Sequence, residues 1–300
     1  MVGWDDYRFF LTVVRTGSHS AAARALGVSQ PTVSRRIEQL EEALGLRVVM
    51  RGPTGCVPTE AGQEILRFVE GIEREAVAID RAMARHRSGG GSPVRLATTR
   101  GLAVWLAPRL RDLPAELRAR LQILIGLHRA DLAHAQADLA LRMGRPGDDE
   151  LRGRKLCRVH SGLYASRRYL EMQGTPTQWE DVAGHPGIRS VEGIAALPQV
   201  QVLDGAVEMQ GGPGANCVAV QIALAKEGLG LTPVPCFMAA EEASLVRVMR
   251  EQFDVPVDLW ALMHPDREAD PAVRSLFDLI VNAVAQDRAL FEGTEDQSAG

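Results

Sequence analysis

Polar residues of the kind that contact DNA gather in one short stretch near the beginning of the chain. This stretch contains Ser29, Gln30, Pro31, Thr32, Ser34, Arg35 and Arg36. Gln and Arg can form two hydrogen bonds to one base edge, while Ser, Thr and Arg bind phosphate oxygens. Apolar residues at positions 33, 37, 40 and 44 recur at helical spacing. We therefore predict a helix with one buried face and one DNA-contacting face, although an ordinary solvated face is the alternative.

The residues before this helix predict the elements that would position it. Ser29 is a good N-cap, and Pro31 suits a first helical turn because its missing N–H has no partner there. A preceding helix would begin after Ser18 and end at Gly27, which suits a left-handed turn. An earlier helix, with apolar residues at 9, 10, 13 and 14, would end at Gly17. Two short helices joined by such a turn are typical of a helix-turn-helix, whose second helix enters the major groove.

A hairpin is expected directly after the helix-turn-helix. Residues 48–51 and 56–58 have the composition of short strands around a turn at 52–55. A hairpin in this place is a wing. Arg51 would then contact backbone phosphate, unless it forms a surface salt bridge instead.

A long helix is predicted from Thr59 to about Arg87, because this stretch contains no proline. Its apolar residues follow one another at spacings of 4, 3, 4, 3 and 4: Ile65, Val69, Ile72, Ala76, Ile79 and Met83. This spacing is typical of a coiled-coil seam, which a two-fold DNA reader needs. A helix packed on its own domain is the alternative. Residues 88–92, Ser-Gly-Gly-Gly-Ser, have the composition of a flexible linker.

The remainder of the chain alternates predicted strands and helices, which indicates a parallel α/β sheet. We expect strands at 94–98, 121–125 and 137–141, and a final amphipathic helix at 272–286. The polar tail at 287–300 is expected to be disordered.

Ligands of such sheets bind at the carboxyl ends of the strands. The candidate binding residues there and at a later helix end are Thr98, Thr99, Arg100, His128, Arg142 and Asn216. Hydroxyl and guanidinium groups suit a carboxylate ligand. For each of these residues a structural hydrogen bond is the alternative role, and the loop at 211–214 is either an anion cradle or a plain turn.

Composition excludes several other classes of protein. Residues 1–62 hold seven arginines and six acidic residues, so DNA binding must depend on local placement of charge within a chain of net charge −4. The four cysteines have no paired metal-binding spacing and are expected to be reduced, with a redox sensor as the less favoured alternative. We expect no metal, no cofactor and no catalytic motif. Without a signal-like segment or an 18-residue apolar run, a cytoplasmic protein with no membrane contact is expected.

The motifs in the first sixty residues are similar to those of a known family of proteins. Residues 4–62 resemble the winged helix-turn-helix of the LysR-type transcriptional regulators, through Phe9-Phe10, Gly17-Ser18, Ala22-Ala23, Val28-Ser29-Gln30-Pro31, Val33-Ser34-Arg35, Leu44-Gly45 and Thr59-Glu60-Ala61-Gly62. His19 stands where a Phe is common in that family, and we expect it to loosen the packing of its helix. The pattern at 137–142, 164–166 and 228–230 is also similar, so the resemblance extends over about residues 4–287.

The resemblance implies an α/β protein with an N-terminal all-α winged helix-turn-helix, a linker helix and a periplasmic-binding-protein-like effector domain of two α/β subdomains. The expected domains are 1–62 for DNA binding, 63–88 for the dimerising linker helix and 93–287 for the effector domain. Within the effector domain, subdomain I would comprise 93–164 and 262–287, and subdomain II 165–261.

We therefore expect a DNA-binding regulator that is not an enzyme and that is controlled by a small-molecule effector, a small organic anion being favoured. A regulator without a ligand, controlled by a protein partner, is the first alternative. An α/β enzyme fused to a DNA-binding module is the second. Expected partners are double-stranded DNA, the effector and further copies of the chain in a homodimer or homotetramer, with RNA polymerase as an open addition.

Overall fold

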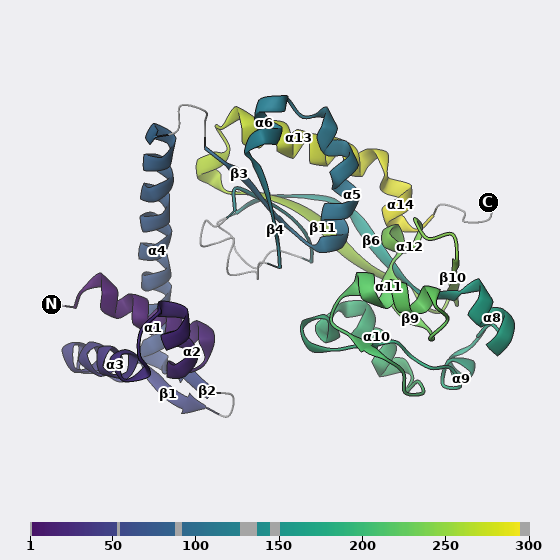
Figure 1. Cartoon of the computed structure of the whole chain (residues 1–300), viewed down its shortest axis with the longest axis horizontal. Helices are drawn as coiled ribbons and strands as arrows, with labels where there is room; N and C mark the ends of the chain where they lie inside the picture. Colours follow the sequence, from purple (N-terminus) through teal and green to yellow (C-terminus); the bar gives the residue numbers. More distant parts are fainter. Residues whose placement is uncertain (1, 53–54, 88–91, 127–136, 145–150, 295–300) are drawn as a thin grey trace. The chain divides into compact units, whose positions relative to one another are not determined.

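The computed structural model describes residues 2–52, 55–87, 92–126, 137–144 and 151–294 (Figure 1). The chain divides into two compact units, Met1–Ser92 and Pro93–Gly300. The first unit contains helices and one hairpin, and the second contains a mixed sheet covered by helices. This arrangement confirms the predicted fold class.

Three short helices form the centre of the first unit, and glycines end each of them. Gly17, Gly27 and Gly45 have φ values of 69°, 68° and 69°, a left-handed conformation that costs glycine little. The N-terminal caps are those predicted: the Ser18 hydroxyl accepts the Ala21 N–H, and the Ser29 hydroxyl accepts the Thr32 N–H. These helices are α1 (Trp4–Thr16), α2 (His19–Leu26) and α3 (Gln30–Leu44).

The wing is attached to the end of α1 by a close backbone contact. Its strands are β1 (Val49–Gly52) and β2 (Gly55–Pro58), which pair antiparallel as predicted. The Cys56 N–H donates to the Gly17 carbonyl at 2.6 Å. A Cβ at Gly55 would lie 2.3 Å from that carbonyl oxygen, so only glycine fits there. Helix α4 (Glu60–Arg87) follows the wing directly.

The sheet of the second unit has the strand order β10-β6-β11-β5-β3-β4, and β9 also pairs with β6. Strand β3 runs parallel to both β4 and β5, as the sequence predicted. The prediction of a parallel sheet is wrong for β6, β9, β10 and β11, which pair antiparallel. A separate pair, β7 and β8, is also parallel. The strands are β3 (Val94–Thr98), β4 (Leu121–Ile125), β5 (Leu139–Met143), β6 (Arg152–Ser166), β7 (Arg189–Ser190), β8 (Gly214–Ala215), β9 (Thr232–Pro235), β10 (Leu245–Val248) and β11 (Val255–Met263).

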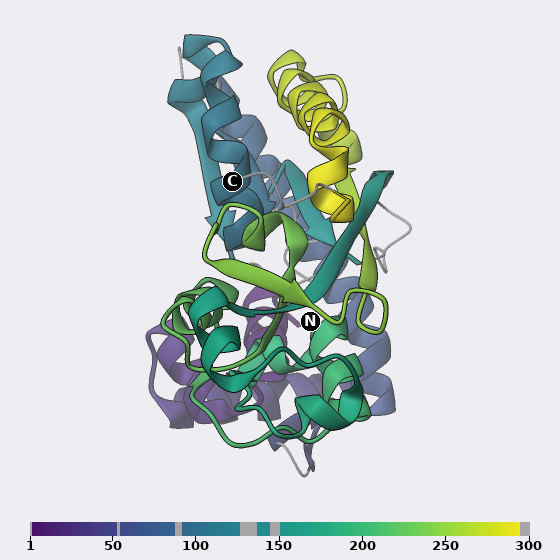
Figure 2. The same ribbon diagram turned by 90° about the vertical axis from the view of Figure 1, so that its right-hand side faces the viewer.

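The long strand β6 connects two groups of elements within this unit (Figure 2). Its first part pairs with β11, whereas its last residues pair with β9 and β10. The surrounding helices and turns are α5 (Arg100–Leu106), η1 (Ala107–Asp112), α6 (Ala115–Arg120), α8 (Arg167–Gln173), α9 (Trp179–Val182), η2 (Glu192–Ala196), α10 (Pro198–Ala206), α11 (Val218–Lys226), α12 (Cys236–Ala239), η3 (Pro265–Arg267), α13 (Pro271–Gln286) and α14 (Arg288–Glu292).

The main core of this unit lies between one face of the sheet and helices α5, α6 and α13 (Figure 1). Alternate strand residues point into it, such as Leu96, Leu139 and Leu259, because side chains alternate across a strand. Trp105 from α5 and Ile280 from α13 close it from the other side.

The expectation of disorder over 287–300 is wrong for residues 287–294. This segment contains α14, and Phe291 is fully buried. The Phe291 ring lies 4.8 Å from the Trp105 ring and 4.9 Å from the Phe237 ring, measured between centroids. One large aromatic side chain in the core therefore outweighs the polar composition of its neighbours. Residues 295–300 lie outside the described part of the chain.

Candidate DNA-binding and effector sites

The residues predicted to contact DNA from α3 differ in their exposure. Gln30, Pro31 and Arg35 are exposed, whereas Thr32 and Ser34 are partly buried. Val33, Ile37 and Leu40 on the opposite side are buried in the core of the first unit, which fixes the rotation of the helix. Ser29 is the N-cap of the helix: its hydroxyl lies 3.4 Å from the Thr32 nitrogen and 2.8 Å from the Thr32 hydroxyl.

Arg36 is partly buried, with 38% of its side chain exposed, and its contacts are with α1. Its Nη1 donates to the Asp6 carboxylate at 2.9 Å, and its guanidinium lies 5.8 Å from the centroid of the Phe9 ring. These contacts join α3 to α1. They give Arg36 a structural role within the first unit, and its DNA contact remains a prediction.

A groove of about 800 Å³ separates α3 from the wing within this unit. Exposed Arg51 on β1 lines it, together with Arg47, Gln30 and Ser34. Polar side chains line the α3 side together with Glu38 and Glu41, and the basic Arg47 and Arg51 line the side of the wing. This placement is consistent with the predicted phosphate contact of Arg51.

The predicted apolar stripe of helix α4 has a buried part and an exposed part. Val69 is 1% exposed and packs in the core of the first unit, with Ile65 against the same cluster. The later residues Ile72, Ile79 and Met83 are exposed. Phe68 is 69% exposed and was missed, because it falls outside the 4, 3, 4 spacing used to identify the stripe.

The second unit contains a cleft of about 610 Å³ that gathers most of the predicted effector residues. Thr98, Thr99, Arg100, Arg142 and Asn216 all line it. They come from the end of β3, the start of α5, the end of β5 and the loop before α11. His128, the remaining prediction, lies outside the described residues.

Several of these polar groups also have structural partners. The Thr98 hydroxyl donates to the Leu141 carbonyl at 2.9 Å, and the Thr99 hydroxyl accepts from the Leu102 N–H at 3.5 Å. The Asn216 amide donates to Glu192 at 2.6 Å. Arg100 is exposed at the first position of α5, where its guanidinium can reach a ligand.

Helix α11 begins at the cleft, with Cys217 as its N-cap and no side chain capping its first N–H groups. The N-terminus of a helix favours negative charge. With Arg100 and Arg142 in the same lining, the electrostatic environment favours an anion.

Sequence reasoning missed Gln199, which lines the cleft while only 3% exposed. It also missed the apolar lining residues Ile125, Leu197, Phe237 and Met238. Ile125 ends the predicted strand 121–125, so its place at the cleft follows from the position of strand ends. No local pattern marks the others, because they reach the cleft from α10, α12 and a neighbouring segment that only the fold brings together.

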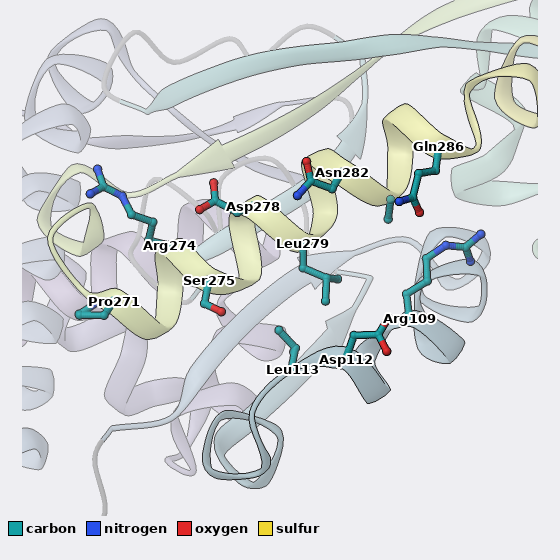
Figure 3. A pocket seen from close by; sticks show the side chains of 11 residues that line it. Arg109, Asp112, Leu113, Pro271, Arg274, Ser275, Asp278, Leu279, Asn282 and Gln286 are labelled. Carbon is teal, nitrogen blue, oxygen red and sulfur yellow. The ribbon is translucent and has the colours of Figure 1, made fainter.

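A second hollow of about 620 Å³ lies between η1 and α13, and Figure 3 shows Leu113 and Leu279 facing each other across it. Its charged residues have both signs, including Arg274, Asp278 and Asp112. Arg109 pairs with Asp287 and lies over the Trp105 ring, 4.7 Å from its centroid. These opposing charges make the hollow less suited to an anion than the cleft.

The four cysteines are unpaired, and two of them are deeply buried. Burial raises the pKa of the Cys157 thiol to about 11 and also raises the pKa of Cys236. Both thiols are therefore protonated and poorly reactive near neutral pH. Within the residues that the structure describes, no three His, Cys, Asp or Glu side chains are grouped to hold a metal ion. No helix in the described part is both long and apolar enough to span a membrane.

Comparisons with known proteins agree with this arrangement. Residues 4–63 match the model of the bacterial regulatory helix-turn-helix protein, lysR family, and residues 87–285 match that of the LysR substrate binding domain. The chain is 26% identical over 296 residues to the transcriptional regulator CrgA of Neisseria meningitidis serogroup C, covering 94% of this chain and 97% of the relative. It is 33% identical over 183 residues to a transcriptional regulator of Xanthomonas campestris, covering 60% of this chain and 53% of that protein.

The solved structure of CrgA from Neisseria meningitidis has the same fold. It aligns with a TM-score of 0.56 and 24% identity, covering 93% of this chain and 97% of the other. Because the two family models together account for most of the chain, this protein belongs to the LysR family of bacterial transcriptional regulators.

Proposed function

We propose that this regulator binds DNA through the exposed face of α3 and the wing, and that a small organic anion in the cleft controls its operator binding or its activation of transcription. The observation that carries the effector proposal is the cleft itself. It brings Arg100, Arg142 and the N-terminus of α11 to one cavity of about 610 Å³. A buried carboxylate requires a cationic or N–H partner, and the cleft supplies both.

The apolar lining of the cleft supports an organic ligand rather than an inorganic ion. Ile125, Leu197, Phe237 and Met238 surround the polar groups. Mostly apolar walls with a few polar groups are typical of sites for small organic molecules. We infer a compact organic acid whose carboxylate meets Arg100 and whose carbon skeleton meets these side chains.

The exposed apolar residues of α4 support assembly through this helix. Phe68, Ile72, Ile79 and Met83 leave an unusual amount of apolar surface in water for one helix. A second copy of the helix would cover it, and a two-fold protein would read two half-sites. We therefore propose a homodimer or homotetramer. We also propose a cytoplasmic location, and RNA polymerase as a further partner during activation.

The test is nuclease footprinting of the full-length protein on the DNA that flanks its own gene, with and without a panel of small organic acids. Thermal unfolding is followed with the same acids. We expect a two-fold footprint, one acid that raises the unfolding temperature, and a footprint that changes when this acid is present. Stabilisation by none of the acids would contradict the anion proposal and favour control by a protein partner. Absence of any footprint would contradict operator binding at this locus.

A further inference from the structure

The first residue of α2 is hydrogen-bonded to the recognition face of α3. Nδ1 of His19 lies 3.0 Å from the Ser34 hydroxyl oxygen. The same oxygen accepts a hydrogen bond from Nε2 of Gln30 at 3.1 Å. The Ser34 hydroxyl therefore joins His19 to Gln30, the residue at the exposed start of α3.

Among the described residues, Ser34 is the hydrogen-bond partner of the His19 ring. Its other nitrogen, Nε2, is buried and has no hydrogen-bond partner among the described residues. The ring is partly buried, and it lines the groove between α3 and the wing together with Gln30 and Ser34. Its orientation is therefore set by packing and by Ser34. The contact with Ser34 is a feature that the expected loosening of α2 by His19 did not include.

We propose that His19 is a positioning residue for base reading: through Ser34 it holds the Gln30 amide ready for the edge of an adenine. A glutamine amide has two N–H donors and one carbonyl acceptor. One N–H is used on Ser34, which leaves the other N–H and the carbonyl for the two hydrogen bonds that adenine offers in the major groove. An amide held in place before binding also loses less side-chain entropy when DNA is bound.

This inference rests on the proposed recognition face of α3, and it makes one specific prediction. Removing the nitrogen of His19 must weaken the preference for adenine at one position of the half-site. It must leave the affinity for other sequences largely unchanged, because Arg51, the proposed phosphate contact, is unaltered. A side chain that only fills space would instead change binding to all sequences together.

The experiment selects duplexes from a randomised DNA library with the full-length protein and with four variants. His19→Phe keeps an aromatic ring but removes both ring nitrogens. His19→Asn keeps an amide near the place of Nδ1, within reach of Ser34. Ser34→Ala and Gln30→Ala remove the other members of the link, and thermal unfolding shows whether each variant is folded.

We expect Gln30→Ala to abolish the adenine preference at one position. His19→Phe and Ser34→Ala should reduce the same preference roughly 2–13-fold, the range for ordering one side chain, and His19→Asn should retain it. If His19→Phe does not fold, Ser34→Ala tests the link when random duplexes are measured beside the specific site. Ser34 is itself a proposed phosphate contact, and losing such a contact would weaken binding to all duplexes alike.

Unchanged preference in both His19→Phe and Ser34→Ala, while Gln30→Ala loses it, would overturn the role of His19 and leave the recognition face in place. A uniform loss of affinity for all duplexes in His19→Phe would also overturn it. Retention of the full preference by Gln30→Ala would contradict the recognition face itself, so the two failures are distinguishable.

Discussion

Arg267 and Asp138 form a buried ion pair in the second unit, with Nε of Arg267 3.1 Å from Oδ1 of Asp138 and side chains only 5% and 4% exposed. The other carboxylate oxygen of Asp138 accepts the Arg95 N–H at 2.7 Å. The pair thus joins the start of β3, the residue before β5 and the turn before α13. It holds together the strands whose ends line the cleft.

Breaking this pair should destabilise the second unit strongly. We expect Arg267→Met to lower the free energy of unfolding by about 3–5 kcal/mol, because it leaves the Asp138 carboxylate buried without its cation. The matched control is Arg152→Met, which breaks the exposed Arg152–Glu268 pair and should change stability by about 0–1 kcal/mol. Urea unfolding of both variants measures the difference, and equal effects would show that the buried pair has no special weight.

Two neighbouring arginines of α3 should respond differently to alanine. Arg35 is exposed, and Arg35→Ala should cost about 1–3 kcal/mol on the specific site while flattening sequence preference. Arg36→Ala instead removes the contacts with Asp6 and Phe9, so it should lower the thermal stability and leave the preference intact. Fluorescence anisotropy on specific and random duplexes, with thermal unfolding, separates the two. Equal weakening on both duplexes would make Arg35 a phosphate contact.

The exposed stripe of α4 should determine the oligomeric state. Ile72→Asp would place a charge in the middle of Phe68, Ile79 and Met83 in both chains of a dimer. We expect the dimer dissociation constant to rise at least about tenfold. Gln63→Asp adds the same charge at another exposed position of α4 and should change little. Light scattering after size exclusion measures the mass, and an unchanged Ile72→Asp dimer at low micromolar concentration would refute this seam.

The effector response should depend on Arg100. Arg100→Ala is expected to abolish stabilisation by the acid that stabilises the wild type, because it removes the exposed cation of the cleft. Operator binding without the acid should persist, since the helix-turn-helix belongs to the other unit. Arg154→Ala removes the same charge from an exposed position near the start of β6, outside the cleft lining, and should respond like the wild type. Thermal shift decides: equal stabilisation of Arg100→Ala and wild type would exclude Arg100 as the anion partner.

A buried histidine should make stability depend on pH. Nδ1 of His185 lies 2.7 Å from the Tyr169 hydroxyl, and burial lowers the pKa of His185 below its ordinary value of 6.5. The unfolded chain therefore binds a proton more readily than the folded one, so this histidine reduces stability as the pH falls below about 6.5. His185→Gln should show a smaller decrease in unfolding temperature between pH 7.5 and 5.5 than the wild type. An identical decrease would assign the pH dependence to other groups.

Local sequence determined the helix-turn-helix and the wing of this protein. The caps at Ser18 and Ser29 and the left-handed turns at Gly17, Gly27 and Gly45 depend on partners only a few positions away. The strand ends that line the cleft were also predictable, for a different reason: parallel strands that alternate with helices place their carboxyl ends at one edge of the sheet.

For residues with two possible roles, only the tertiary structure decided whether the side chain contacts a distant part of the chain or remains exposed. Arg36 meets Asp6 from 30 positions away, and Arg109 meets Asp287 from 178 positions away. Val69 looked like part of a dimer seam but packs in its own core, and Phe291 orders a tail of polar composition. Gln199 enters the cleft with no local signal. The periodicity of a helix shows which residues share a face, but which neighbour covers that face depends on segments far away in the chain.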